Sequence, residues 1–297
     1  MLFLESLEYR LLSLDTTYDT IRYETPSTGV ARIVLARAEQ RNAQNLAMTY
    51  ELDAAFKRAA ADTEIRVIIL AADGPHFSSG HDLRDRSTPE DYAQITNWGG
   101  FRAPGAEGRQ AFEEEVYLGM CWRWRNLPKP TIAQTQGKTI AGGLMLAWVC
   151  DLIIAAEDAT FSDPVVAFGV NGVEYFGHPW EFGVRKAKEL LFTGGAIGAQ
   201  EAKTLGMVNH VIPRDELEAF TLELAKRIAL RPAMGLRLAK QSVNQAQDAQ
   251  GFWSALNAAM SLQQLGHSHN AEVHGYPVDP EGMKLIRGDA KPTGKPG

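Results

Sequence analysis

Two glycine-containing turns hold the residues best suited to chemistry in this sequence. Residues 77–83 read Phe-Ser-Ser-Gly-His-Asp-Leu, and residues 137–143 read Gly-Lys-Thr-Ile-Ala-Gly-Gly. The second turn follows a predicted strand and opens a predicted helix, whose first backbone N–H groups have no partner inside the helix. Such groups suit an anion or a carbonyl oxygen that gains negative charge, and the missing side chain of Gly142 would let a ligand approach closely. Taken alone, such turns more often reflect close packing of a helix on a strand, so both interpretations stay open.

Other ligand sites receive little support. Neither turn has the GxGxxG spacing of a dinucleotide site, and the sequence contains no GxxxxGK[ST] phosphate loop. His267, His269 and His274 lie close together in the sequence, but they lack the carboxylate spacing of a metal site. We therefore predict no metal ion and no separate cofactor.

The elements that position the two turns alternate between strands and helices. Short β-branched runs predict strands at 20–23, 29–35, 66–71, 131–135 and 151–155. Apolar residues at helical spacing predict helices at 49–60, 110–126 and 142–149. This alternation indicates an α/β fold with crossover helices.

From Asp215 onward the pattern is helical only. Leu217, Phe220, Leu224 and Ile228 form one apolar stripe, and further helices are predicted after Pro232 and over about 252–265. We expect an N-terminal extension at 1–17, an α/β core at 18–214, a helical region at 215–265 and an irregular or disordered tail at 266–297.

Composition excludes several classes of protein. The chain has 297 residues, of which 45% are hydrophobic and 22% charged, as in ordinary globular proteins. The net charge is −6 and the basic residues are scattered, so we predict no nucleic-acid partner. Charged residues interrupt the N-terminal segment and the longest apolar stretch, so we predict neither a signal peptide nor a membrane span. Two cysteines in apolar surroundings agree with a reducing, cytoplasmic location.

Several motifs occur in the order and spacing of a known family. The sequence resembles the crotonase (enoyl-CoA hydratase/isomerase) superfamily over residues 18–265. The matching segments are 30–35 with 41–43, 66–70 with 77–83, 137–152, 161–164 and 189–209. The resemblance implies a spiral of ββα units, a C-terminal helical trimerisation region, a homo-oligomer (trimer or hexamer) and an acyl-CoA substrate.

The resemblance also implies roles for individual residues. The backbone N–H groups of His81 and Gly142 would hold the thioester carbonyl oxygen and stabilise the enolate formed beside it. The imidazole of His81 would be tolerated rather than required. The implied substrate contacts are Arg41, Ala43, Ser79, His81, Asp82, Leu83, Gly142 and His178.

One departure concerns the acid/base residues. The two positions that hold glutamates in hydratases of this family hold Met145 and Val165 here. Neither side chain can transfer a proton, so ordinary hydration of an enoyl thioester is not expected. Asp82 and Asp163 are interpreted as turn-forming or capping residues.

Glu174 is the replacement that the resemblance suggests. It lies within a residue or two of an aspartate that related isomerases and synthases carry on the same loop. The apolar neighbours Val173, Tyr175 and Phe176 would favour the protonated carboxyl group, as general acid/base catalysis near neutrality requires. The alternative is a salt bridge of Glu174 at a subunit contact. His178 is interpreted as structural, with a supporting role at the site as the alternative.

These observations leave three classes of function. The first is an acyl-CoA enzyme that stabilises a thioester enolate: an isomerase, a hydratase variant, or a C–C or thioester hydrolase. The second is an acyl-CoA-binding protein without catalysis. The third is a scaffold or RNA-binding relative, which the acidic isoelectric point near 5.7 disfavours. Aromatic residues suggest a bulky acyl group; they are Trp98, Phe101, Tyr175, Phe176 and Trp180.

Overall fold

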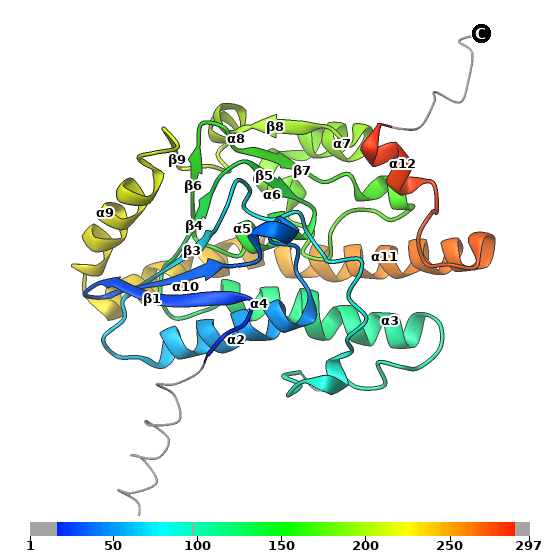
Figure 1. The fold of residues 1–297 in the computed structure, drawn as a ribbon, viewed down its shortest axis with the longest axis horizontal. Helices are drawn as coiled ribbons and strands as arrows, with labels where there is room; N and C mark the ends of the chain where they lie inside the picture. The colour runs from blue at the N-terminus through cyan, green and yellow to red at the C-terminus, as the bar shows by residue number, and fades with distance from the viewer. Residues whose placement is uncertain (1–16, 97, 289–297) are drawn as a thin grey trace, which may run out of the picture.

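A computed structural model describes residues 17–96 and 98–288, and its centre is a six-stranded sheet (Figure 1). The strand order is β1-β2-β3-β4-β6-β9, with β1 antiparallel to β2 and each later neighbour parallel. The bounds are β1 Ile21–Ser27, β2 Val30–Leu35, β3 Val67–Ala72, β4 Thr131–Thr135, β6 Leu152–Ala156 and β9 His210–Ile212. The five predicted strands are confirmed as β1, β2, β3, β4 and β6.

A smaller sheet has the order β5-β7-β8. These strands are β5 Lys138–Ile140, β7 Thr160–Ser162 and β8 Ala196–Gly198. An isolated bridge between Ser78 and Thr139 joins the first glycine turn to β5. The chain therefore visits the large sheet and then the region of the small sheet in succession, which is the spiral expected for a crotonase-like fold.

Helices cover both faces of the large sheet because alternate strand residues point to opposite sides. Ile33 and Leu70 belong to the main core with α2, whereas Val34 and Ile69 pack with α9. Both faces are buried, which explains the nearly continuous apolar strands. The helices are α2 Leu46–Ala61, α3 Ala106–Glu113, α4 Gly119–Arg125, α5 Gly142–Trp148, α6 His178–Phe182, α7 Val184–Thr193, α8 Ala199–Leu205 and α9 Leu217–Ala229.

The predicted helix over 110–126 is interrupted by a π-helical segment, Glu114–Leu118, between α3 and α4. A π-helix forms i→i+5 hydrogen bonds and so has more residues per turn than an α-helix, which changes the side chains that face inward. Glu113 and Glu115 are both buried as a result, although they are only two positions apart. Glu115 accepts hydrogen bonds from the backbone N–H groups of Ile95 and Thr96, so it holds the long preceding loop.

The prediction of an irregular tail from residue 266 is wrong for the described part of that segment. The last three helices are α10 Ala233–Ala249, α11 Phe252–His274 and α12 Gly282–Arg287. Polar contacts rather than an apolar stripe hold the end of α11, because His267 contacts Glu113 and Asn270 donates to the carbonyl oxygen of Phe168. Residues 1–16 of the predicted N-terminal extension, and residues 289–297, lie outside the described residues. Among the helices described, none has the length and apolar character needed to cross a membrane.

Candidate active site

The two glycine turns lie against each other at one end of the sheets. The N–H of Ile140 donates to the carbonyl oxygen of Ser78 at 2.9 Å, and Ser78 in turn donates to Lys138. Gly80 has φ +89°, and a Cβ added there would lie 3.1 Å from the nitrogen of Gly142. Only glycine fits this approach of the two backbones.

The backbone N–H groups of His81 and Gly142 are therefore brought close together. Gln44 pairs with the residues on either side of His81: its N–H donates to Gly80 and its carbonyl oxygen accepts from Asp82, both at 2.8 Å. This pairing turns the N–H of His81 away from Gln44. Within residues 17–96 and 98–288, neither the His81 nor the Gly142 N–H donates to another protein group. The site therefore has two backbone donors available to a ligand.

The side chain of His81 also belongs to this site. Its ring lies against Gly142, where an added Cβ would be 2.6 Å from Cε1, and it stacks on Tyr117 with 3.9 Å between centroids. Nε2 of His81 lies 3.1 Å from Oε2 of Glu174. Nδ1 is buried and has no partner among the described residues. The sequence pattern indicated only a backbone role for His81, so this side-chain contact was missed.

Glu174 reaches the same place from the loop before α6. It is only 7% exposed, and its Oε1 accepts a hydrogen bond of 3.1 Å from the side-chain amide of Gln263 on α11. Both described partners of this carboxylate, His81 and Gln263, lie within the same chain. The structure thus brings together Glu174, His81 and Gly142, which the resemblance selected.

Asp163 fixes the loop that carries Glu174. Its carboxylate accepts hydrogen bonds from the N–H groups of Val165 and Val173, and it lies 2.8 Å from Nε2 of His178. His178 is fully buried and packs on Phe176 and Trp148. His178 therefore supports the loop from inside and does not reach an open surface, which corrects its assignment as a substrate contact.

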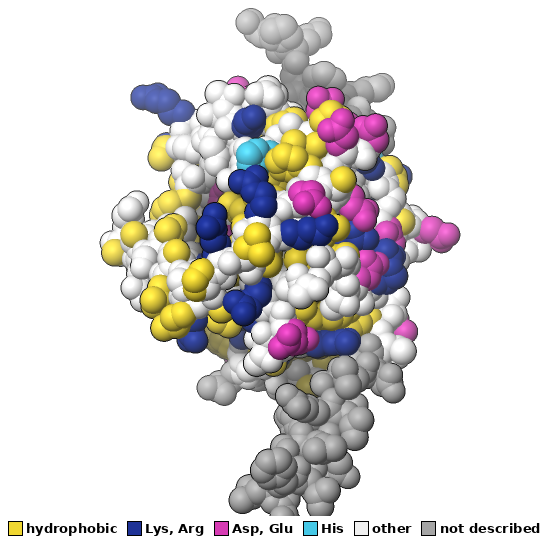
Figure 2. Space-filling model, turned by 90° about the vertical axis from the view of Figure 1, so that its left-hand side faces the viewer, with side chains coloured by type: hydrophobic (Ala, Val, Ile, Leu, Met, Phe, Trp, Pro, Cys, Tyr) yellow, Lys and Arg dark blue, Asp and Glu magenta, His cyan; other side chains and the backbone are white. Residues whose placement is uncertain are grey.

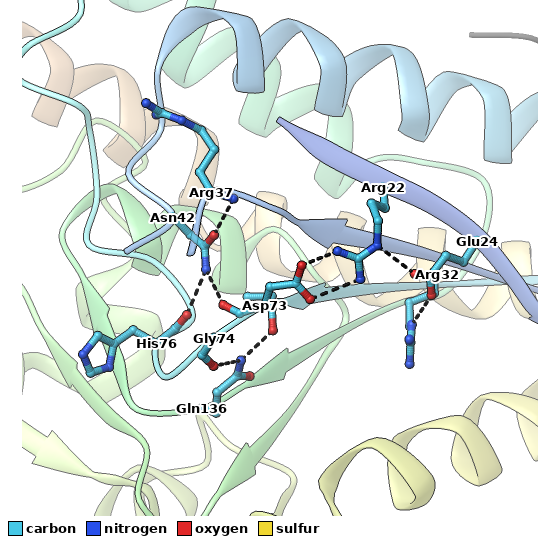
Figure 3. A network of polar contacts seen from close by, with 10 residues as sticks. Arg22, Glu24, Arg32, Arg37, Asn42, Asp73, Gly74, His76 and Gln136 are labelled. Atoms are coloured by element: carbon cyan, nitrogen blue, oxygen red, sulfur yellow. Dashed lines mark hydrogen bonds and ion pairs between the residues drawn. The ribbon is translucent and has the colours of Figure 1, made fainter. Parts of the chain in front are cut away.

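The remaining predicted contacts form a rim beside the turns. Arg41 and Asn42 have φ of +55° and +51°, and the carbonyl oxygen of Arg41 accepts from the N–H of Ser79 at 3.0 Å. Figure 3 shows how the buried Asn42 holds this turn: it donates to the carbonyl oxygens of Asp73 and His76 and accepts from the N–H of Arg37. The turn at 41–43 is thereby fixed beside residues 79–83.

Asp82 and Leu83 complete that rim. Asp82 accepts from the backbone N–H of Arg84 and forms an ion pair of 3.0 Å with Arg37, as expected of a turn-forming residue. Leu83 is 61% exposed. A small cavity of about 70 Å³ adjoins these residues and reaches Tyr117, the residue that stacks on His81.

A second buried carboxylate near this site was not foreseen. Oε1 of Glu113 lies 3.2 Å from Nε2 of His267, and its Oε2 accepts a 2.5 Å hydrogen bond from Gln264. Burial raises the pKa of Glu113; the hydrogen bond from His267 opposes this rise, and the charge of Glu174 adds to it. Glu113 and Tyr117 stand four apart in the sequence, but the π-helical segment that turns both inward leaves no sequence signal. His267 thus contacts a carboxylate, and no group of three metal-ligating side chains occurs in the described part of the chain.

Comparison with known proteins gives a family match over most of the chain. The profile of the family described as enoyl-CoA hydratase/isomerase matches residues 25–276. EchA13 of Mycobacterium tuberculosis, named as an enoyl-CoA hydratase, is 51% identical over 266 residues, covering 87% of this chain and 84% of the relative.

Solved structures give the same result. A probable enoyl-CoA hydratase from Mycobacterium thermoresistibile has a TM-score of 0.80 at 50% identity, covering 87% of this chain and 99% of that chain. An enoyl-CoA hydratase/isomerase from Xanthobacter autotrophicus Py2 has a TM-score of 0.77 at 31% identity, covering 93% of this chain and 100% of that chain.

Proposed function

The chain belongs to the enoyl-CoA hydratase/isomerase family, and we propose that it moves a proton at the carbon next to an acyl-CoA carbonyl group. The observation that carries this proposal is the contact of the His81–Glu174 pair with Gly142, beside two unpaired backbone N–H groups. The His81–Glu174 pair supplies a group that can accept a proton. The two backbone N–H groups supply donors for the negative charge that proton removal creates.

The two N–H groups form the proposed oxyanion hole. Removal of a proton from the α-carbon of a thioester leaves an electron pair that delocalises onto the carbonyl oxygen. Donors already directed at that oxygen stabilise the enolate more than the uncharged thioester, by roughly 3–4 kcal/mol for each donor in comparable enzymes. Gly142 contributes at the first turn of α5, whose dipole also favours negative charge there.

The His81–Glu174 pair is the proposed acid/base. The ring of His81 lies over Gly142, so a carbonyl oxygen bound to the two N–H groups would place the α-carbon beside this pair. The α-proton moves to the pair and the C–H electrons move to the carbonyl oxygen. Return of the proton to the α-carbon restores the thioester, and return to the γ-carbon of an enoyl chain moves the double bond. Gln263 holds Glu174 in place during both transfers.

We favour proton movement over hydration because Met145 and Val165, at the two positions that the resemblance assigns to the hydratase glutamates, have no ionisable side chain. Met145 is 2% exposed inside α5, and Val165 begins the 3-10 helix after Pro164, so neither position can orient water. An acyl-CoA-binding protein without turnover is the second candidate. It is favoured by one observation, that both oxygens of Glu174 already have protein partners.

Exchange of the α-proton in D₂O separates these functions. We expect the protein to incorporate deuterium into at least one saturated thioester among butyryl-, hexanoyl- and phenylacetyl-CoA, detected as a mass increase. Saturated thioesters can form an enolate but cannot be hydrated. Calorimetry on the same compounds measures binding independently. Binding without any exchange would support the second candidate, and no binding at millimolar concentration would contradict both.

A further inference from the structure

A second buried acid–base pair lies beside the first. Glu113 ends α3 and His267 lies on α11, and the two side chains meet at 3.2 Å. Glu113 is 7% exposed and His267 9% exposed. The other nitrogen of His267 lies 2.7 Å from the carbonyl oxygen of Pro277, which fixes the orientation of the ring. This pair takes no part in the proton transfer described above.

Consecutive residues of α11 connect the two pairs. Gln263 donates to Glu174, and Gln264 donates to Glu113. The connection also runs through the helix opposite, because Tyr117 stacks on His81 and lies four residues beyond Glu113. Two carboxylates held by adjacent side chains of one helix are close enough for the charge of each to affect the protonation of the other.

The two pairs differ in their access to solvent. Glu113 lines an open cavity of about 380 Å³, together with Arg102, Arg109 and Phe112. The lining of that cavity does not include Glu174. A substrate bound over His81 would further cover Glu174. The Glu113–His267 pair can therefore exchange protons with solvent through this cavity.

Building on the proposed function, we infer that Glu113 and His267 form a proton-holding pair whose charge sets the pH range over which the His81–Glu174 pair removes a proton from substrate. Glu113 acts through Glu174 and is a positioning residue, since it does not contact the oxyanion donors. Gln263 and Gln264 of α11 hold the two pairs at a fixed spacing. The sequence did not predict this pair, because residues from 266 onward were expected to form an irregular tail.

The charges around Glu113 determine the sign of the effect. His267 and Gln264 face it from α11, Glu174 from the loop, and Arg109 and Tyr117 from its own helical segment. Burial raises the pKa of Glu113. Burial lowers the pKa of His267, but the hydrogen bond and charge of Glu113 outweigh this and raise it overall.

Both pKa values are raised, and the pair is uncharged overall while it holds one proton. As the pH rises further, the pair loses that proton and becomes negative. A negative charge beside Glu174 strengthens this carboxylate as a base. The rate of α-proton exchange should therefore rise by a further step on the alkaline side, by roughly tenfold or less for one partly screened charge.

Nuclear magnetic resonance of the full chain tests the coupling without substrate. The imidazole of His267 is titrated in the wild type, in Glu113→Gln, in Glu174→Gln and in Glu107→Gln, a control on the exposed side of α3. We expect the His267 midpoint to fall by about one pH unit or more in Glu113→Gln, to fall less in Glu174→Gln, and to stay unchanged in Glu107→Gln. A His267 midpoint that Glu174→Gln leaves in place would overturn the coupling.

The exchange assay tests its consequence. The alkaline step in the pH profile of wild-type exchange should disappear in Glu113→Gln and remain in Glu107→Gln. A profile that keeps its shape in Glu113→Gln overturns the inference even if the rate is lower, because a purely structural role changes the rate alone. Absence of exchange in the wild type would instead contradict the proposed function, and the titration of His267 would still decide the coupling.

Discussion

His81 shows how one residue can serve the site through both its backbone and its side chain. The resemblance to the family implied the backbone role. The side chain contacts Glu174, which lies 93 positions away in the sequence. A local sequence pattern cannot predict a contact between residues so far apart in the chain. Glu174 itself could be selected only because relatives carry an acid on the same loop, whereas Gln263 and Glu113 had no such guide.

Crotonyl-CoA hydration should be slow or absent. The resemblance assigns Met145 and Val165 to the positions of the hydratase glutamates, and a general acid or base typically contributes 10²–10⁴-fold to the rate. Loss of absorbance of the conjugated thioester at saturating substrate measures this directly. A turnover above roughly 10 per second, the median for enzymes, would show that another pair of residues orients water.

At the scale of elements, the buried polar side chain of Asn42 joins segments that the sheet alone leaves separate. It connects the turn at 41–43 to the segment after β3, and Gln136 donates to the carbonyl oxygen of Ala72 at the end of the same strand. The network in Figure 3 includes the ion pair of Arg22 with Asp73 at this corner. These contacts fix the position of the turn at 41–43 relative to the glycine turn at 77–83.

Replacing Asn42 should destabilise this corner. Asn42→Gly keeps the freedom to adopt positive φ but removes hydrogen bonds to three backbone groups, and leaving such buried groups unpaired costs about 1–3 kcal/mol each. We expect the free energy of unfolding to fall by roughly 2–4 kcal/mol. Urea unfolding followed by circular dichroism measures this fall.

Arg41→Gly is the matched control, because Arg41 also has positive φ but its side chain is exposed. It should change stability by less than about 1 kcal/mol. Equal losses in the two variants would mean that backbone conformation, rather than the amide of Asn42, holds the turn.

The strands and the long helices could be predicted because burial on one or both faces leaves a periodic apolar signal. The end of α11 could not, since its contacts are polar: His267 and Asn270 are both buried and hydrogen-bonded within the chain. A helix face that binds carboxylates and carbonyl groups looks like a solvent-exposed segment in the sequence. The helix therefore continues beyond residue 265, the end expected from the sequence, to His274.

At the scale of the whole molecule, apolar side chains remain exposed on the helical region. Leu230, Met234 and Leu238 recur every four residues around the start of α10, and they are 84%, 61% and 49% exposed. Large exposed apolar side chains grouped in this way favour association with another protein surface. The face of the molecule in Figure 2 likewise shows hydrophobic side chains among both basic and acidic ones.

We therefore expect a closed homo-oligomer, a trimer or a hexamer, as symmetric assemblies are the usual means of covering such surfaces. Sedimentation velocity at micromolar concentration measures the assembly. The double variant Met234→Glu with Leu238→Glu should shift it toward the monomer, whereas Gln245→Glu on the same helix should not. A wild type that sediments as a single monomeric species contradicts the prediction.

The most direct test of the proposed proton transfer is the effect of Glu174→Gln on deuterium incorporation into a bound saturated thioester. Glutamine keeps the shape of the side chain but cannot accept the proton. Glu181→Gln is the control, because burial raises the pKa of Glu181 to about 8 while this residue lines a different cavity, beside α10. We predict that Glu174→Gln lowers the exchange rate at least about 10²-fold with thioester affinity unchanged, and that Glu181→Gln exchanges at the wild-type rate. Wild-type exchange in Glu174→Gln would contradict the assignment of the His81–Glu174 pair as the acid/base.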